Sequence, residues 1–318
     1  MKTTIQNHSS FDLIGDIHGF ATPLRELLDL LGYRKSGDTY RHPEGRKVIF
    51  AGDFIDRGPE IRETLHLVRS MIDSDDAIAI MGNHEYNAVC FHTPDGKGDY
   101  LRSHTYKDGK NIKQHETTLR AFAGLDREWD EWIRWFRELP FYLDLGNLRV
   151  VHATWHRDSI RFLKGKSLAD DDFLKSSVCP DTPEFESVEI VLKGLEIPLP
   201  DGNFYEDKQG FRRSCSRVKW WECPDTLSYR DAVFPFCDTV SDDLIDFTKV
   251  SPWGTYPDSD PPVFFGHYWI PASEAPRPQR SNIACLDYSV AKPGGKLVAY
   301  RWDGEQTLDS EKFVSGPS

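Results

Sequence analysis

Three short apolar runs in the first third of the chain each lead directly into a polar, glycine-flanked segment. The runs cover residues 11–15, 47–51 and 77–81, and stretches with helical periodicity lie between them. Apolar runs that alternate with helical stretches predict βαβ units, in which a helix links two parallel strands. This pattern restricts the chain to an α/β layer architecture, with a polar segment at the end of each strand.

The first linking stretch has the spacing of an amphipathic helix. Leucines between residues 24 and 31 recur at i, i+3, i+4 and i+7, which places them on one face. We predict that Thr22 caps this helix, because a hydroxyl at the N-cap accepts a backbone N–H, and that Gly32 ends it. Residues 59–70 repeat the pattern and are predicted to form the second linking helix.

The second half of the chain returns to β-structure. Residues 141–145 and 148–153 are predicted to form a hairpin around Gly146-Asn147, and a further β-rich stretch spans residues 263–302. These late strands imply a second sheet. We therefore predict an α/β sandwich in which two mixed β-sheets lie face to face, flanked by helices.

The domain organisation follows from where the periodicity weakens. We predict a single domain over residues 1–318, with its core in residues 11–156 and 262–303. Residues 157–261 have weak periodicity and many Pro and Asp residues, and they are predicted to form an insertion or lid over the active site. An independent second domain is the alternative, which the low apolar density of the segment disfavours.

The charge balance excludes several classes of protein. Lys and Arg total 39 against 51 Asp and Glu, which gives a formal net charge of −12. Non-specific binding to nucleic acid or to an anionic membrane requires clustered basic residues, so neither partner is expected. A polar amino terminus and the lack of a long apolar run predict a cytoplasmic protein without a membrane span. The six scattered cysteines contain no CxxC pair and are expected to be reduced.

The polar segments at the strand ends carry the residues of a candidate site. They read GDIHG at 15–19, GDFIDRG at 52–58 and GNHE at 82–85. Ligands of α/β sheets bind at the carboxyl ends of the strands, so one crevice should bring together Asp16, His18, Asp53, Asn83 and His84. One such segment alone would be read as a solvated turn, but three in order favour a site.

The residue types in this crevice predict a metal centre. Carboxylate, imidazole and amide oxygen suit a divalent ion such as Mn, Fe or Zn rather than a soft metal. Two ions fit this set better than one, because a central aspartate can bridge ions about 3.5 to 4 Å apart. We predict Asp53 as the bridging ligand.

In these three segments the chain resembles the calcineurin-like metallophosphoesterase superfamily, whose hallmarks are GDxHG, GDxxDRG and GNHE. The superfamily adds two later histidines, each after a strand. His152 follows Val150 and Val151 but lacks the two glycines of the usual HGG motif, whereas His267 follows Phe264-Phe265-Gly266 as expected. The resemblance covers residues 11–156 and 262–303, and it is strongest for the branch of protein phosphatases and bacterial diadenosine tetraphosphatases.

The resemblance implies a ligand for each position of a two-metal site. One ion would be held by Asp16, His18 and Asp53. The second would be held by Asp53, Asn83, His152 and His267. A hydroxide that bridges the two ions would then attack phosphorus.

The resemblance also implies roles in proton transfer and phosphate binding. His84 looks like the general acid, Asp56 looks like the group that orients it, and Arg57 looks like the phosphate clamp. Because the superfamily often recruits a second arginine from its variable region, the basic stretch around residues 211–221 is a candidate. We expect Arg213 or Arg217, or their neighbour Arg212, to contact phosphate. Seven further histidines lie outside the motifs and are assigned no function: His8, His42, His66, His92, His104, His115 and His156.

Three functions are consistent with this sequence. The first is hydrolysis of phosphomonoesters, most of all by a phosphoprotein phosphatase acting on phosphoserine, phosphothreonine or phosphotyrosine. The alternative is a symmetrical dinucleoside polyphosphate hydrolase acting on diadenosine tetraphosphate. A non-catalytic binding scaffold of the same fold is the third, and it would have no chemical need for His84, Asp56 and Arg57 together. Nothing periodic predicts a coiled coil.

Overall fold

The computed structural model describes residues 10–107, 109–200, 203–206, 212–235, 240–248 and 253–316. Outside these ranges lie His8, Phe211 at the start of the basic stretch, and Cys237, one of the six cysteines. The five cysteines within them carry no disulfide. In the described part of the chain, no helix combines the length and the apolar character needed to cross a membrane.

The first sheet contains the three strands predicted from the apolar runs. β1, β4 and β5 are parallel neighbours, and β16 extends the sheet by pairing antiparallel with β1, so the sheet is mixed. Its strands are β1 (Phe11–Ile14), β4 (Lys47–Phe50), β5 (Ala77–Ala79), β15 (Asp287–Tyr288), β16 (Lys296–Trp302) and β17 (Phe313–Ser315). A separate hairpin of β2 (Arg34–Ser36) and β3 (Thr39–Arg41) was not expected.

The second sheet contains the predicted hairpin. β6 (Tyr142–Asp144) and β7 (Arg149–Val151) are antiparallel, whereas β7, β13 (Val263–Phe265) and β14 (Ile283–Cys285) run parallel, so this sheet is also mixed. One apolar cluster joins Leu13 and Ile49 of the first sheet to Val150 and Phe264 of the second. The two sheets therefore lie face to face, which confirms the predicted α/β sandwich.

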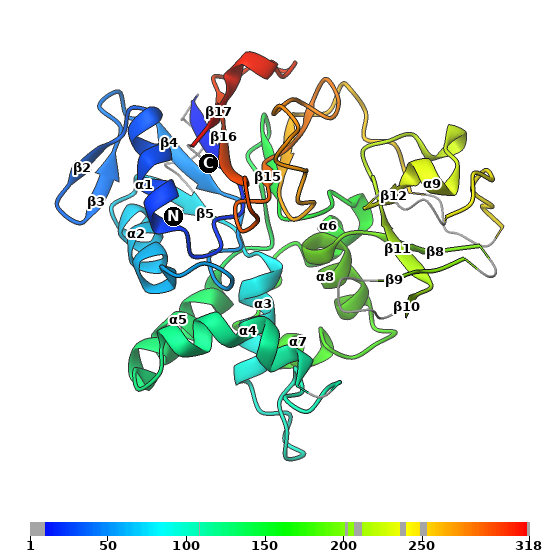
Figure 1. The fold of residues 1–318 in the computed structure, drawn as a ribbon, viewed down its shortest axis with the longest axis horizontal. Helices are drawn as coiled ribbons and strands as arrows, with labels where there is room; N and C mark the ends of the chain where they lie inside the picture. Colours follow the sequence, from blue (N-terminus) through cyan, green and yellow to red (C-terminus); the bar gives the residue numbers. More distant parts are fainter. Residues whose placement is uncertain are drawn as a thin grey trace.

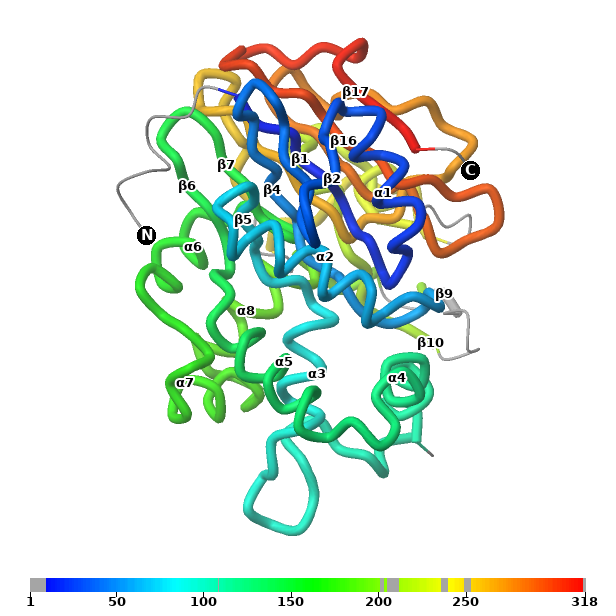
Figure 2. Tube along the Cα trace, turned by 90° about the vertical axis from the view of Figure 1, so that its left-hand side faces the viewer, coloured from blue at the N-terminus to red at the C-terminus, as the bar shows by residue number. Residues whose placement is uncertain are grey.

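Helices cover the outer faces of the sandwich. Helices α1 and α2 lie on the outer side of the first sheet, and α3 to α5 lie below it in Figure 1. Their bounds are α1 (Ala21–Leu30), α2 (Ile61–Asp73), α3 (Asn83–His92), α4 (Lys110–Ala121) and α5 (Asp126–Glu138). The loop between α3 and α4 projects away from the sheets (Figure 2).

The start of α1 corrects one prediction. Phe20, not Thr22, holds the N-cap position, and it makes no side-chain cap. Thr22 lies inside the first turn, where its backbone N–H donates to Oε2 of Glu60 at 2.8 Å and its hydroxyl donates to Oε1 at 2.6 Å. A carboxylate from a distant segment thus satisfies a helix-end N–H, an interaction that local sequence spacing does not reveal.

The segment predicted as an insertion contains regular structure. Three helices come first, and Val188 and Leu192 of the third belong to the main apolar core. The elements are α6 (Arg157–Leu163), α7 (Asp171–Ser176), α8 (Pro183–Lys193), β8 (Glu196–Pro198), β9 (Tyr205–Glu206), β10 (Arg212–Arg213), β11 (Cys215–Val218), η2 (Pro224–Thr226), α9 (Tyr229–Ala232) and β12 (Val233–Phe234). Near the carboxyl end, η3 (Ser310–Lys312) precedes β17. A lid function for residues 157–261 stays a prediction.

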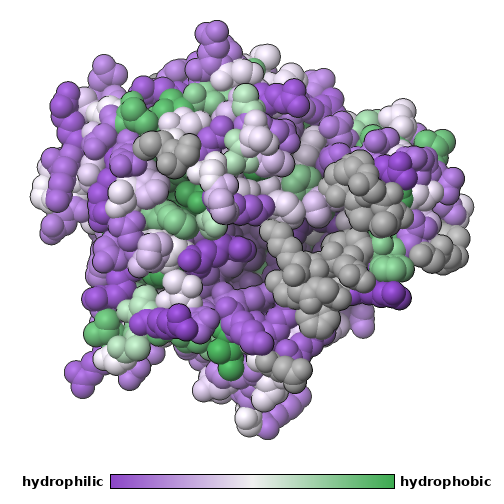
Figure 3. All heavy atoms as spheres, in the orientation of Figure 1, coloured by the Kyte–Doolittle hydropathy of each residue, from purple (hydrophilic) through white to green (hydrophobic). Residues whose placement is uncertain are grey.

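β8, β11 and β12 form a small antiparallel sheet on the right of Figure 1. Between this sheet and the strand ends of the sandwich, Figure 3 shows a hollow bordered mostly by hydrophilic side chains. The candidate site lies along this hollow.

Candidate metal centre and phosphate-binding cavity

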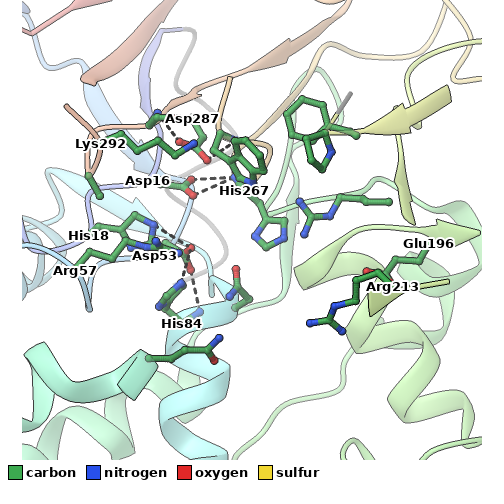
Figure 4. Close-up of a pocket in the computed structure, with 18 of the residues that line it drawn as sticks. Asp16, His18, Asp53, Arg57, His84, Glu196, Arg213, His267, Asp287 and Lys292 are labelled. Carbon is green, nitrogen blue, oxygen red and sulfur yellow. Dashed lines mark hydrogen bonds and ion pairs between the residues drawn. The ribbon is translucent and has the colours of Figure 1, made fainter. Parts of the chain in front are cut away.

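The strand ends meet at one cavity, as the motif order predicted. It has a volume of about 440 Å³, and side chains that follow β1, β4, β5 and β13 line it. Of the predicted site residues, those that line it are Asp16, His18, Asp53, Arg57, Asn83, His84, Arg213, Arg217 and His267. Figure 4 shows His18, Asp53 and His84 close together on one side and Arg213 on the other.

Asp53 lies at the centre of two groups of ligand-type atoms. His18 Nε2 lies 3.6 Å and His84 Nε2 lies 3.9 Å from Oδ2 of Asp53, while His152 Nε2 lies 3.4 Å from its Oδ1. The atoms of His18, Asp53 and His84 lie within 4.8 Å of one another, and so do those of Asp53, His152 and His267. Because both groups share Asp53, its geometry suits the bridging role predicted for it.

Backbone carbonyls orient two of the imidazoles. Nδ1 of His18 donates to the carbonyl of Ile55 at 3.0 Å, and Nδ1 of His152 donates to that of Ala51 at 2.8 Å. A proton on Nδ1 leaves the lone pair of a neutral imidazole on Nε2, the atom that faces Asp53. Outer hydrogen bonds of this kind hold histidine ligands in metal sites.

The electrostatics of the cluster favour a bound cation. Burial opposes the charged form of His152, but Asp53 and Asp16 outweigh it and raise its pKa to about 10. Asp53 and Asp16 thus stabilise positive charge at this position. Nε2 of His267 is buried without a hydrogen-bond partner among the described residues. An imidazole nitrogen without a hydrogen-bond partner, next to these carboxylates, is a suitable ligand for a divalent metal ion.

Asp16 and Asn83 are placed differently from the simplest prediction. The carboxylate of Asp16 accepts the backbone N–H of His267 at 3.1 Å, and Asp16 belongs to neither close group of ligand atoms. Burial raises the pKa of Asp16 well above its usual value, and Asp287 adds to the effect. Oδ1 of Asn83 lies 3.0 Å from Nε2 of His152. Both residues line the site, and their roles as ligands stay predictions.

A hydrogen-bond network holds His84. Its Nδ1 donates to Oδ2 of Asp56 at 2.6 Å, while Oδ1 of Asp56 accepts from His115 at 2.8 Å and from Thr118 at 2.6 Å. Burial would raise the pKa of Asp56, but the hydrogen bonds from His115 and His84 outweigh it and lower that pKa. An ionised Asp56 holds the proton of His84 on Nδ1, so Nε2 faces Asp53.

His115 corrects the prediction that histidines outside the motifs have no role at the site. It reaches Asp56 from α4, in a part of the chain without a motif. Only a weak indication of this contact lies in the sequence, where His115 and Thr118 are three residues apart and so share a helix face. His156, by contrast, lies outside the cavity and caps α6.

Glu85, the last residue of the GNHE motif, joins two of the loops. Its carboxylate is fully buried and accepts backbone N–H groups of Asp53 at 2.8 Å, Phe54 at 2.8 Å and Gly82 at 3.0 Å. Burial, followed by the charge of Asp53, raises the pKa of Glu85 to about 7. A Cβ on Gly82 would lie 2.2 Å from Oδ1 of Asp53, so the approach of the loops requires glycine.

The backbone is strained at five of the predicted site residues. His18, Asp53, Asp56, Arg57 and His267 all have φ between 50° and 67°. Side chains rarely adopt this left-handed conformation, and such strain concentrates at functional sites. The tertiary contacts of the loops hold these residues in place.

The arginines of the basic stretch divide between cavity and surface. Arg213 and Arg217 line the cavity, whereas the exposed Arg212 stacks over Phe204, 4.2 Å from its ring centre, and does not line it. Arg217 stacks on Tyr268, and its Nε is buried without a partner in the described ranges. Arg57 is exposed at the opposite wall. The chain thus presents guanidinium groups from two sides.

Asp287 is a further acidic residue at the site that the sequence analysis did not select. It is buried, lines the cavity and accepts the backbone N–H groups of Trp269 at 2.7 Å and Ser289 at 2.9 Å. Burial raises its pKa. No motif marks it, because it enters the site only where the chain passes from the second sheet into the first.

The fold and this site define the class of protein. The sequence model of the calcineurin-like phosphoesterase family matches residues 9–198. The chain therefore belongs to this family, which confirms the resemblance. The match extends into the segment predicted as an insertion.

Curated relatives carry more specific names. The asymmetrical bis(5'-nucleosyl)-tetraphosphatase PrpE of Halalkalibacterium halodurans is 46% identical over 160 residues, which cover 47% of this chain and 59% of that protein. Its counterpart in Oceanobacillus iheyensis is 32% identical over 149 residues, 45% of this chain and 54% of that protein. The chain thus spans just over half the length of these relatives. The symmetrical bis(5'-nucleosyl)-tetraphosphatase of a Marinomonas species is 28% identical over 317 residues, 94% of this chain and 95% of that protein.

Proposed function

We propose that this protein is a metal-dependent hydrolase of dinucleoside polyphosphates. The observation that carries the proposal is the cavity beyond the metal centre, which continues past His84 into a second cavity of about 850 Å³. A phosphomonoester needs room for one phosphate and its leaving group. A site with basic side chains along an extended path suits a chain of phosphates.

The names of the relatives support the same choice. The curated relatives are nucleosyl-tetraphosphatases, both asymmetrical and symmetrical, rather than protein phosphatases. They favour the alternative of the sequence analysis over its first choice, a phosphoprotein phosphatase. The two kinds of relative differ in which phosphate bond is cleaved, so the bond chosen by this chain is set by how its own cavity places the substrate.

Different residues around the reacting phosphorus bind the metal ions and the phosphate oxygens. His18, Asp53, His152 and His267, with Asp16 and Asn83 beside them, would hold two divalent ions, which would supply Lewis-acid activation of water and phosphate when bound. Arg57 and Arg217 hold the remaining oxygens of the attacked phosphate from opposite walls, since a guanidinium can grip two oxygens at once. Arg213 supplies a further positive charge.

His84 protonates the leaving oxygen. Burial opposes its charged form, but Asp53 and Asp56 outweigh burial and raise the pKa of His84, which favours the protonated form that a general acid requires. Asp56 keeps the imidazole of His84 oriented by accepting the 2.6 Å hydrogen bond from Nδ1. A leaving phosphate is a better leaving group than an alkoxide, so this proton matters least for polyphosphates and most for alkyl phosphates.

The test compares substrate classes on one preparation. Metal-stripped protein, reloaded singly with Mn, Fe, Zn, Co or Mg, is given diadenosine tetraphosphate, phosphoserine and phosphotyrosine peptides, and an aryl phosphate. We expect kcat/KM to be highest for the dinucleotide, and the nucleotide products identify the bond that is cleaved. The Asp53→Asn variant, which should lose metal, controls for contaminating phosphatases. A preference for the phosphopeptides would restore the phosphoprotein phosphatase hypothesis, and no turnover of any substrate would favour a binding scaffold.

A further inference from the structure

The second cavity contains a cation that the proposed mechanism does not use. The cavity lies between α3, α4 and α8 and shares Asn83, His84 and Gln114 with the metal centre. Arg102, from the projecting loop between α3 and α4, lines it. Its side chain is partly buried, and burial lowers the pKa of Arg102 although Glu189 and Asp56 oppose the shift.

Within the described ranges, Arg102 has no carboxylate within ion-pair distance. Its two terminal nitrogens instead donate to amide oxygens, Oδ1 of Asn87 at 2.9 Å and Oε1 of Gln114 at 2.8 Å. These bonds use two of the five N–H donors of the guanidinium. A partly buried charge with no carboxylate in contact is costly, and an anion in the cavity would lower that cost.

The two amides complete a set of donors. Because Arg102 occupies both amide oxygens, the NH₂ groups of Asn87 and Gln114 are left to donate to another acceptor. Two of the carboxylates that share the cavity have other partners: Asp56 binds His84 and His115, and Glu189 pairs with Lys193. The basic residues outnumber the acidic ones around this cavity, in contrast to the whole chain. They are Arg57, Arg102, Lys113, Lys193, Arg213 and Arg217, against Asp56, Glu186, Glu189 and Glu196.

The position of this donor set relates it to the reaction. Asn87 follows Asn83 by four residues on α3, so the two side chains lie on one face about one turn, or 5.4 Å, apart. An anion held by Arg102 and Asn87 would therefore lie next to the metal centre, on the side of α3 and α4. A phosphate chain attacked at the metal centre could reach it without a break.

We propose that Arg102, Asn87 and Gln114 form a second anion subsite that binds phosphate groups of the substrate beyond the one attacked. The identity of the anion as part of a dinucleoside polyphosphate rests on the proposed function. The subsite itself requires an acceptor-rich polyanion and no nucleoside. It makes the enzyme selective for polyphosphate chains over phosphomonoesters.

The test uses inorganic anions as competitive inhibitors of aryl phosphate hydrolysis. Inhibition constants of tripolyphosphate and orthophosphate are measured at one free Mn²⁺ concentration for the wild type and for Arg102→Gln. A charge-assisted hydrogen bond contributes about 1.5–3 kcal/mol, so we expect the tripolyphosphate constant to rise about ten- to a hundredfold. The orthophosphate constant and the aryl phosphate kcat/KM should stay within about twofold.

The controls separate the subsite from a loss of structure. Arg120→Gln removes the same charge from the exposed face of α4, where Arg120 pairs with Glu116, and should change neither constant. Arg102→Lys keeps the charge without the planar fork and should give an intermediate tripolyphosphate constant. An unchanged tripolyphosphate constant in Arg102→Gln, or an equal rise for both anions, would overturn the proposal.

The same proteins distinguish this proposal from the proposed function. If the wild type does not hydrolyse diadenosine tetraphosphate but Arg102→Gln still loses tripolyphosphate selectively, the substrate assignment fails and the subsite stands. If the dinucleotide is hydrolysed equally well by both proteins, the subsite falls and the proposed function stands.

Discussion

The two walls of the cavity are built in different ways. The metal wall consists of short loops after parallel strands, where residues of different motifs contact each other directly and the backbone is strained at His18, Asp53 and His267. The opposite wall consists of α4, α8 and the small sheet with β11, which bring Arg217 and Gln114 to the cavity from regular elements. The first wall holds the residues proposed to act in catalysis, and the second is suited to select the substrate.

The largest effect should come from the centre of the metal wall. Asp53→Asn removes one charge from a carboxylate that faces both groups of ligand atoms. Loss of an outer hydrogen-bond partner of a ligand costs about 10- to 100-fold in metal affinity, and the shared ligand should cost more. Metal content after gel filtration, together with turnover, measures this. A variant that keeps both ions would show that Asp53 does not bridge them.

The next largest effect should separate metal binding from proton transfer. His84→Asn should retain metal but lower kcat by roughly 10² to 10⁴ for poor leaving groups, and less for an aryl phosphate with a good one. Rates across a series of leaving groups, with metal analysis of each sample, measure this. Metal loss in the variant would assign His84 to the ligand set, as its place in the first group of ligand atoms allows.

Substitutions in the opposite wall should change substrate binding more than turnover. Arg217→Met should raise KM for phosphoester substrates about tenfold with a smaller change in kcat, because it removes a guanidinium from the cavity. Arg212→Met is the matched control, since Arg212 stacks on Phe204 outside the cavity. Equal effects of the two variants would mean that overall charge, not position, matters.

His115 tests whether the two walls are coupled. It reaches from α4 to Asp56, so His115→Phe should loosen the orientation of His84 and lower kcat about tenfold for poor leaving groups, with KM nearly unchanged. His115→Asn, which can still donate to Asp56, should recover part of the loss. His104→Asn is the control, because His104 stacks on Phe91 and Tyr100 away from Asp56. A loss confined to KM would contradict a positioning role.

The last effect concerns stability beside the cavity and leaves the reaction itself unchanged. Burial, with His115 and His104, lowers the pKa of His92 to about 4 from an unfolded value near 6.5. Between these values the unfolded chain binds more protons, so the contribution of neutral His92 is complete above pH 6.5 and is lost as pH falls towards 4. The loss lowers the free energy of unfolding by at most about 3 kcal/mol. Chemical denaturation of the metal-free protein at several pH values measures the free energy of unfolding. In His92→Phe this free energy should depend less steeply on pH than in the wild type. An equal pH dependence in the two proteins would contradict the burial effect.

The sequence alone was sufficient for the three parallel strands of the first sheet and for most of the metal wall, but it assigned the late strands to a second sheet, whereas β15 and β16 join the first. Strands, linking helices and polar strand ends are encoded within a few residues of each other, and parallel strands must bring their carboxyl ends to one edge. For the same reason the hairpin around Gly146 and the late strands could be predicted. The motif residues His152 and His267 needed the resemblance, because no local pattern distinguishes them from other histidines.

Only the tertiary structure decided the rest. Glu60 holds the start of α1, His115 reaches Asp56 from α4, Asp287 enters the site between the two sheets, and Arg102 faces a cavity formed by three helices. Each of these contacts joins segments far apart in sequence or with no pattern of their own. Sequence periodicity describes which face of an element is buried, whereas the partner of a polar side chain on that face depends on how the elements pack against each other.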